Sequence, residues 1–269
     1  MTGVGPAYPF GRVPRSVVLV AVLLGVAGFF SAVSCVTPWF SESGTIPGHP
    51  FHSAFTLDFA PGPNGYLISC VIVVTTSSCF TTAYDYSAGS GTALLTGLYV
   101  GLLAAMIVAG VLAFVSVGLI IAGFFDKIRV RRARQLAVTL LLVALLAGGI
   151  SAAAFPALQS PALSASHACG GFNGSSSPCN SLAGAVSGVG CQGGTCAETN
   201  VTWSPAEGWY FALAATGLIA GALLVLRTWP LGAPCGACGA ENSFREEYCR
   251  ACSNPLPVRR KKPRRATGP

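Results

Sequence analysis

Four uninterrupted apolar stretches constrain this chain more than any other feature of its sequence. None of them has a charged residue or a histidine in its interior. About 20 residues of helix are needed to cross the roughly 30 Å hydrocarbon core of a bilayer. The sequence therefore predicts four transmembrane helices, at residues 16–37, 93–125, 136–155 and 209–228. The second stretch is long for one crossing, so a tilted helix or one that continues beyond the lipid is expected.

The composition agrees with a membrane protein. Only 9% of the 269 residues are charged and 52% are hydrophobic. An ordinary soluble domain has about a quarter charged residues, and a disordered chain is far less apolar. Both classes are therefore excluded, and a membrane-embedded all-α four-helix bundle is the expected fold.

The positions of the basic residues predict the orientation of the helices. All 16 Lys and Arg lie in residues 1–15, in residues 126–135, or from the end of the fourth stretch onward. The two other connections, residues 38–92 and 156–208, contain neither residue type. Basic residues are retained on the cytoplasmic side of membranes. We therefore expect a multi-pass protein of the plasma membrane with both termini in the cytoplasm and two loops outside.

The first apolar stretch has an alternative interpretation. Arg12 and Arg15 precede it, and Ala32-Val33-Ser34 precede Cys35. Basic, apolar and small residues in this order also fit a cleavable signal peptide. Cleavage would leave three helices without changing the sidedness of the remainder.

Six cysteines lie in the two predicted outer loops. One pair is in the first loop and two pairs are in the second, namely Cys70 and Cys79, then Cys169, Cys179, Cys191 and Cys196. Even numbers of cysteines outside the cell fit disulfides, and the four in the second loop allow three connectivities. Cys35, at the end of the first helix, belongs to none of these pairs and is expected to act as a small buried apolar residue. Asn173 and Asn200 begin glycosylation sequons in the second loop.

Four further cysteines follow the fourth helix in two Cys-x-x-Cys pairs. Four thiolates on two turns are the ligand set of a closed tetrahedral zinc site, in which the metal stabilises the fold and has no open position for catalysis. The sequence therefore predicts a structural Zn²⁺ in a cytoplasmic zinc ribbon at residues 229–256, with Tyr248 and Phe244 packing inside it and the ligands Cys235, Cys238, Cys249 and Cys252. This segment resembles the short zinc ribbons at the ends of many prokaryotic proteins.

A basic tail at residues 257–269 completes the chain. Its charged residues are Arg259, Arg260, Lys261, Lys262, Arg264 and Arg265. A basic run beside a membrane can bind anionic lipid, and it can equally contact nucleic acid or remain a disordered tail that reinforces the topology.

The first outer loop has the composition of a β-sheet. β-branched and aromatic residues dominate residues 66–86, which favours strands. Residues Thr75–Ser78 can turn the chain and bring Cys70 and Cys79 together across a hairpin, and Phe51–Phe59 can add a third strand. A helix over Leu67–Val74 is the alternative, but it is too short to cross a membrane.

Several residues of this loop resemble a known family. Trp39 follows the first helix, and Gly65-Tyr66-Leu67-Ile68-Ser69-Cys70 is followed by Cys79. This pattern resembles the claudin superfamily, which has a Trp at the same place, then Gly-Leu-Trp-x-x-Cys and a second Cys. The resemblance implies a Cys70–Cys79 disulfide within an extracellular antiparallel sheet. It also implies that Trp39, Gly65 and Leu67 anchor this sheet on the helices.

The resemblance covers about fifty residues and has clear departures. Tyr66-Leu67 replaces Leu-Trp, the second outer loop is longer and has additional cysteines, and a zinc ribbon stands at the cytoplasmic end. Members of the family form cell–cell junctions or act as accessory subunits, and a fold is carried over more readily than a function.

The functional hypothesis that follows is a non-enzymatic structural or interaction protein. Ion pathways and relays need charges inside the membrane, and motifs for a nucleophile, a base or a phosphate loop are absent from the sequence. We expect the outer sheet to contact cell-surface proteins, membrane proteins or a second copy of the chain, with no small-molecule substrate. The alternatives are a membrane thiol-disulfide oxidoreductase and a sensor or adaptor that signals through the zinc ribbon.

Overall fold

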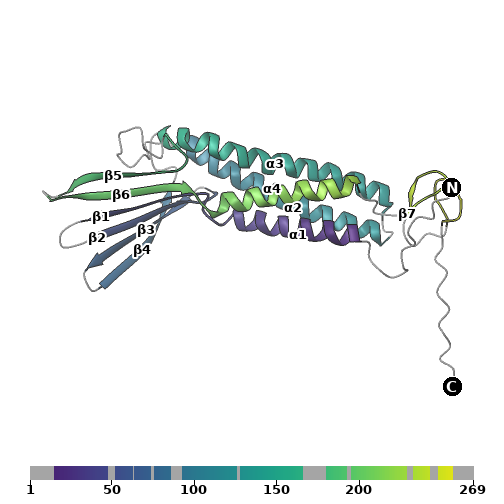
Figure 1. Ribbon diagram of the computed structural model, residues 1–269, viewed down its shortest axis with the longest axis horizontal. Helices are drawn as coiled ribbons and strands as arrows, with labels where there is room; N and C mark the ends of the chain where they lie inside the picture. Colours follow the sequence, from purple (N-terminus) through teal and green to yellow (C-terminus); the bar gives the residue numbers. More distant parts are fainter. Residues whose placement is uncertain are drawn as a thin grey trace, which may run out of the picture.

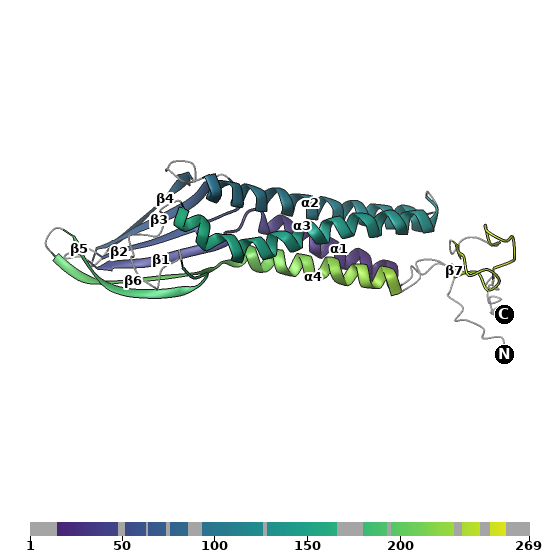
Figure 2. The ribbon, with the colours of Figure 1, turned by 90° about the horizontal axis from the view of Figure 1, so that it is seen from above.

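The computed structural model has a helical bundle with a β-sheet at one end and a small cysteine-rich unit at the other (Figures 1 and 2). It describes residues 15–47, 52–62, 64–73, 76–85, 93–125, 128–165, 180–192, 195–228, 233–242 and 248–256.

The bundle consists of four helices, each long and apolar enough to cross a membrane. They are α1 (Arg15–Ser34), α2 (Ala93–Phe124), α3 (Val130–Ala165) and α4 (Glu207–Thr228). Helix α1 packs against α2 and α4, and α3 packs against α2 and α4. Small residues of α1, α2, α3 and α4 fill much of the shared core, among them Ala27, Ala113, Ala144 and Ala222. The prediction of four helices long and apolar enough to span a membrane is confirmed, which indicates a multi-pass membrane protein.

Helix α3 is much longer than the predicted span of residues 136–155. It continues to Ala165 and contains Pro156 and Pro161. Proline has no N–H to donate to the carbonyl four residues earlier, so Pro156 leaves the Ala152 carbonyl without its helical partner. The indole Nε1 of Trp209 on α4 donates to this carbonyl at 3.1 Å. Trp209 on the neighbouring helix therefore replaces the hydrogen bond that Pro156 cannot make. For this reason α3 continues past Pro156, where the sequence predicted its end.

Both predicted outer loops contribute to one antiparallel sheet. It has six strands in the order β4-β3-β2-β1-β6-β5. The first loop forms β1 (Phe40–Pro47), β2 (His52–Phe59), β3 (Asn64–Val73) and β4 (Thr76–Asp85), and the second forms β5 (Gly184–Gln192) and β6 (Thr195–Pro205). Strand β1 pairs with β2 on one side and β6 on the other. The two described strands of the second loop thus extend the sheet of the first loop.

The predicted hairpin and third strand are confirmed as β3–β4 and β2, with one correction. Val73 is the register partner of Thr76, so residues 76–78 belong to β4 and the turn is shorter than the predicted Thr75–Ser78. Strands β1, β5 and β6 were not predicted. Glycines and serines weaken the strand signal of β1 and β5, as the sequence Gly-Ala-Val-Ser-Gly-Val-Gly of β5 illustrates.

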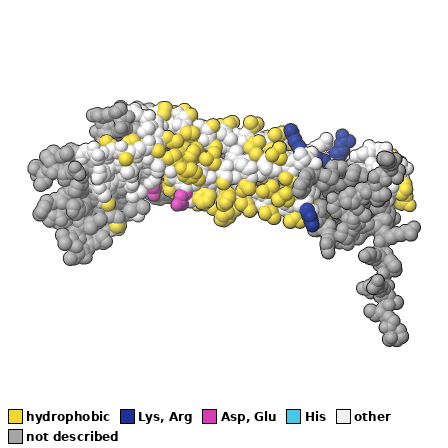
Figure 3. All heavy atoms as spheres, viewed as in Figure 1, with side chains coloured by type: hydrophobic (Ala, Val, Ile, Leu, Met, Phe, Trp, Pro, Cys, Tyr) yellow, Lys and Arg dark blue, Asp and Glu magenta, His cyan; other side chains and the backbone are white. Residues whose placement is uncertain are grey.

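The helix ends define two ends of the molecule. Arg15 begins α1, residues 129–134 lie around the start of α3, and Arg227 lies in the last turn of α4. On the face shown in Figure 3, the Lys and Arg side chains gather at the end of the bundle away from the sheet, beyond a broad hydrophobic surface. We refer to these two ends as the basic end and the sheet end.

Candidate metal centre and sheet–bundle junction

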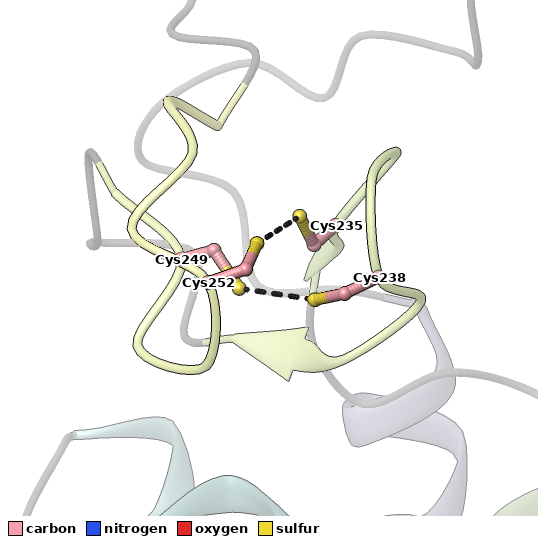
Figure 4. A group of neighbouring side chains, drawn as sticks. All are labelled: Cys235, Cys238, Cys249 and Cys252. Carbon is pink, nitrogen blue, oxygen red and sulfur yellow. Dashed lines mark hydrogen bonds between the residues drawn. The ribbon is translucent and has the colours of Figure 1, made fainter.

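Four cysteines of the C-terminal unit converge on one point. The Sγ atoms of Cys235, Cys238, Cys249 and Cys252 all lie within 4.8 Å of one another, and Figure 4 shows them pointing toward a common centre. The Cys235–Cys252 and Cys238–Cys249 sulfur distances are 3.6 and 3.5 Å. Tetrahedral zinc with bonds of about 2.3 Å places its sulfurs about 3.8 Å apart. The cluster can hold a metal ion such as zinc, as the sequence predicted.

The two Cys-x-x-Cys turns have the same backbone design. The amides of Cys235 and Cys249 donate to the carbonyls five residues on, at 2.9 and 2.8 Å. In return, the amides of Gly239 and Ser253 donate to the carbonyls of these cysteines at 2.8 Å. The residue after the second cysteine of each pair has a positive φ, 71° at Gly239 and 55° at Ser253. A serine in this conformation is strained, which indicates that the surrounding turn determines its backbone.

Hydrogen bonds affect the ionisation of the thiols. Backbone donors at Cys238 and Ala237 lower the pKa of Cys235. Burial opposes ionisation of Cys249, but hydrogen bonds from the Ala251 and Cys252 backbone lower its pKa to about 6. At Cys252, a backbone hydrogen bond from Asn254 lowers the pKa, but the neighbouring thiols and burial raise it to about 12. Adjacent thiols resist simultaneous ionisation, and a bound cation removes this conflict by balancing the charge of the thiolates.

Asn242 joins the two turns and was not recognised from the sequence. It is buried, and its Nδ2 lies 3.5 Å from the Sγ of Cys249 and donates to the Ala240 carbonyl at 2.7 Å. Its Oδ1 accepts from the amide of Arg250 at 3.0 Å. Partners of this kind orient the ligands of a metal.

The predicted packing inside the ribbon is wrong for Tyr248. Its side chain is 62% exposed, and the residues buried in the unit are Cys235, Cys249 and Leu256. Phe244 and the basic tail with Arg259, Arg260, Lys261, Lys262, Arg264 and Arg265 lie outside the described residues.

Trp39 is the centre of the sheet–bundle junction. Its side chain is fully buried, its Nε1 donates to the Ser34 carbonyl at 2.9 Å, and its ring lies edge-on to Phe155 at 5.5 Å. Its amide donates to the Phe59 carbonyl and its carbonyl accepts from Ala206, both at 2.8 Å. One residue therefore connects α1, β2, α3 and the start of α4.

Aromatic residues from several elements complete the junction, which was predicted only in part. Phe40 lies edge-on to Phe59 at 5.7 Å, and Phe59 stacks on Tyr99 of α2 at 5.9 Å. Tyr99 donates to the buried Gln159 Oε1 at 2.8 Å. The predicted anchors Gly65 and Leu67 belong to β3, opposite Tyr84 and Thr82 respectively, and the side chain of Leu67 lies outside the described set.

Gly208 makes room for Trp39. Its amide donates to the Pro38 carbonyl at 2.8 Å. A Cβ at this position would lie 2.5 Å from Trp39 Cδ1, and 2.7 and 2.8 Å from the carbonyl oxygens of Thr37 and Pro38. Two of these atoms belong to the backbone, so only glycine allows the start of α4 to approach residues 37–39 this closely.

In each of two hairpins, the strand register places two cysteines opposite each other. Cys70 pairs with Cys79 across β3–β4, and Cys191 pairs with Cys196 across β5–β6. Cys79 is not one of the free cysteines among the described residues. Cys169 and Cys179 lie outside those residues, as does Asn173. Asn200 is exposed on β6, and Cys35 is half-buried beyond the end of α1.

Glu42 is a buried carboxyl at the junction. It is 3% exposed, and its register partners are Leu57 on β2 and Trp203 on β6. Within the described part of the chain its carboxyl group has no hydrogen-bond or ion-pair partner. Burial raises the pKa of Glu42, because an apolar environment disfavours the charged form.

Replacement of Glu42 by glutamine is expected to change the pH dependence of stability. The folded protein binds this proton more tightly than the unfolded chain, so the stabilisation is present at acidic pH. It is lost as pH rises from the unfolded pKa of about 4.5 through the raised folded pKa. Thermal unfolding of E42Q between pH 4 and 8 should lack this loss, and at pH 8 the variant should exceed wild type by roughly 1–3 kcal/mol. Equal pH slopes in the two proteins would contradict the assignment.

Comparison with known proteins identifies no relative: no protein-family model matches the chain, and no curated protein matches its sequence.

Proposed function

We propose that this chain is a claudin-like, non-enzymatic membrane protein that presents its sheet outside the cell for contacts with other surface or membrane proteins. The observation that carries the proposal is the sheet itself. Its strands come from both loops between the helices, and Trp39 joins it to the bundle through backbone and side-chain hydrogen bonds. A surface held this firmly by a bundle suits recognition, since little ordering entropy is lost when a partner binds.

The orientation follows from the two ends of the molecule. The arginines of the helices gather at the basic end, and the positive-inside rule favours a proposed orientation in which that end, the zinc ribbon and both termini lie in the cytoplasm, with the bundle in the plasma membrane. The sheet end then lies outside, where cysteine pairs oxidise. In this orientation the Cys70–Cys79 and Cys191–Cys196 pairs form disulfides, and Asn200 is exposed on the side where glycans are added.

The ribbon has a structural zinc ion in this proposal and offers a cytoplasmic partner a small folded surface. Four cysteine ligands leave no open coordination position, so the metal supplies folding energy only. Deletion of residues 229–269 should abolish the cytoplasmic interaction and leave the outer contacts unchanged.

A thiol-disulfide oxidoreductase is the alternative from another class. Such an enzyme needs a reactive pair with an accessible, low-pKa thiol. Both Cys-x-x-Cys pairs of this chain lie in the candidate metal centre, whereas Cys70 and Cys79 are register partners within a hairpin. Quinone reduction by the purified protein would support the enzyme. A sensor that signals through the ribbon is distinguished by a ligand-dependent change at the ribbon.

Photo-crosslinking in intact cells tests the outer contacts. A photoreactive residue is placed at Thr81 on β4 or Asn200 on β6, both exposed, and at the lipid-facing Leu224 as a control. The two sheet positions should give discrete protein adducts, either with a second copy or with another membrane protein, and Leu224 should give lipid adducts. The adducts should disappear in Trp39→Ala, because this variant lacks the side chain that attaches the sheet to the bundle. Lipid adducts alone from all three positions would refute the proposal.

A further inference from the structure

An apolar groove runs between α1 and α2 at the basic end. It has a volume of about 430 Å³, and its walls include Val18 and Val22 of α1, Ile121 of α2 and Phe125 directly after α2. These four side chains are each between 42% and 55% exposed. The groove is therefore open along the side that faces the lipid, and its volume falls in the roughly 300–1,000 Å³ range of small-molecule sites.

Arg15 and Arg129 lie at the same end of the bundle as this groove. Arg15 precedes Val18 by three residues and Val22 by seven, so all three occupy one face of α1. Arg129 is exposed and follows Phe125 by four residues. Arg134, in contrast, donates to the Arg227 carbonyl at 3.1 Å. Within the described residues, neither Arg15 nor Arg129 has a side-chain partner, so both guanidinium groups remain available for a ligand.

We propose that the α1–α2 groove binds an anionic phospholipid, with one acyl chain along the groove and the phosphate at Arg15 and Arg129. The inference rests on the membrane placement proposed above and is independent of the function of the sheet. An acyl chain matches the wholly apolar walls, and a phosphate matches two unpaired arginines.

The zwitterionic lipid of the surrounding bilayer fits the same groove but lacks the net charge. Each basic residue near the headgroups strengthens anionic lipid binding by a factor of about five. The groove should therefore prefer phosphatidylglycerol to phosphatidylcholine. A lipid-facing surface without both the groove and the arginines should show a much smaller preference.

Fluorescence quenching by brominated lipids measures this preference at a chosen residue. The full chain is reconstituted with brominated phosphatidylglycerol or brominated phosphatidylcholine, with F125W as the reporter in the groove. L224W is the matched control, because Leu224 is 65% exposed at the same end and lies three residues from Arg227. The unsubstituted chain provides the background of the four native tryptophans.

The F125W reporter should show an anionic preference of at least about fivefold, with a value near one at L224W. Arg15→Gln in the F125W background should remove about fivefold of the preference, and Arg15→Lys should retain part of it. If F125W fails to fold, V22W reports on the same groove. Equal preferences at the groove and at L224W, or no effect of Arg15→Gln, would overturn the proposal. Either result would leave the crosslinking test of the sheet unaffected.

Discussion

For the zinc-bound ribbon proposed above, removal of the metal, or replacement of Cys249 by serine, is expected to unfold residues 233–242 and 248–256 while the helices and the sheet remain intact. The unit has two strands of two residues each, β7 (Ala233–Pro234) and β8 (Glu241–Asn242). Its core consists of two of the ligands and Leu256. Such a core cannot offset the entropy of ordering the chain. Metal binding, at roughly 10–16 kcal/mol in zinc-finger peptides, then supplies the folding energy.

Hydrogen exchange of the purified protein with and without a chelator measures this effect. Amides of the two cysteine turns, including Gly239 and Ser253, should lose protection, whereas amides of α2 and β1 should keep theirs. Cys35→Ser is the matched control, because Cys35 lies at the other end of the chain and outside the cluster. Asn242→Ala should weaken zinc binding by about 10–100-fold without abolishing it. Full protection of the unit in the metal-free protein would contradict this account.

The sequence predicts best the features that depend on neighbouring residues. Cysteine spacing within each turn predicts the four-cysteine cluster, because both cysteines of a pair lie on one short turn. The four spans were found because an apolar run of sufficient length has few alternatives. The end of α3 was missed because Pro156 is compatible with a helix only if another group takes the Ala152 carbonyl. That group is Trp209, more than fifty residues further along the chain.

Pairing between distant strands was outside the reach of pattern analysis. Strand β1 pairs with β6, with Phe40 opposite Pro205, although the two strands belong to different loops. Glu42 illustrates the same point: a Glu between two serines gives no local sign of burial, yet its side chain is buried on a strand paired with both β2 and β6. Trp39 was predicted as an anchor, but only tertiary structure shows that Gly208 must lack a side chain beside it.

Trp39→Ala is expected to cost about 3–5 kcal/mol of stability and to loosen the sheet from the bundle. The substitution removes a fully buried indole, its hydrogen bond to the Ser34 carbonyl and its contact with Phe155. Hydrogen exchange should increase at the base of β1 and β2 before the bundle opens, because α1 and α4 keep their own core. Trp39→Phe should give a smaller loss, since the aromatic contact is kept. Simultaneous opening of the sheet and the bundle would mean that the sheet–bundle junction does not unfold independently of the helices.

Gly208→Ala changes the α4 side of the contact with Trp39 and is the sharper test of the sheet–bundle junction. The added methyl would meet the carbonyl oxygens of Thr37 and Pro38 as well as the Trp39 ring. Because backbone atoms cannot move aside cheaply, we expect a loss of roughly 1–3 kcal/mol. Gly217→Ala is the matched control on the same helix, since nothing lies within 4 Å of a Cβ there. It should leave the stability unchanged or raise it by up to about 1 kcal/mol, because alanine favours helix. If the two alanine variants unfold at the same temperature in thermal melts, close packing of α4 against Trp39 does not hold the sheet in place.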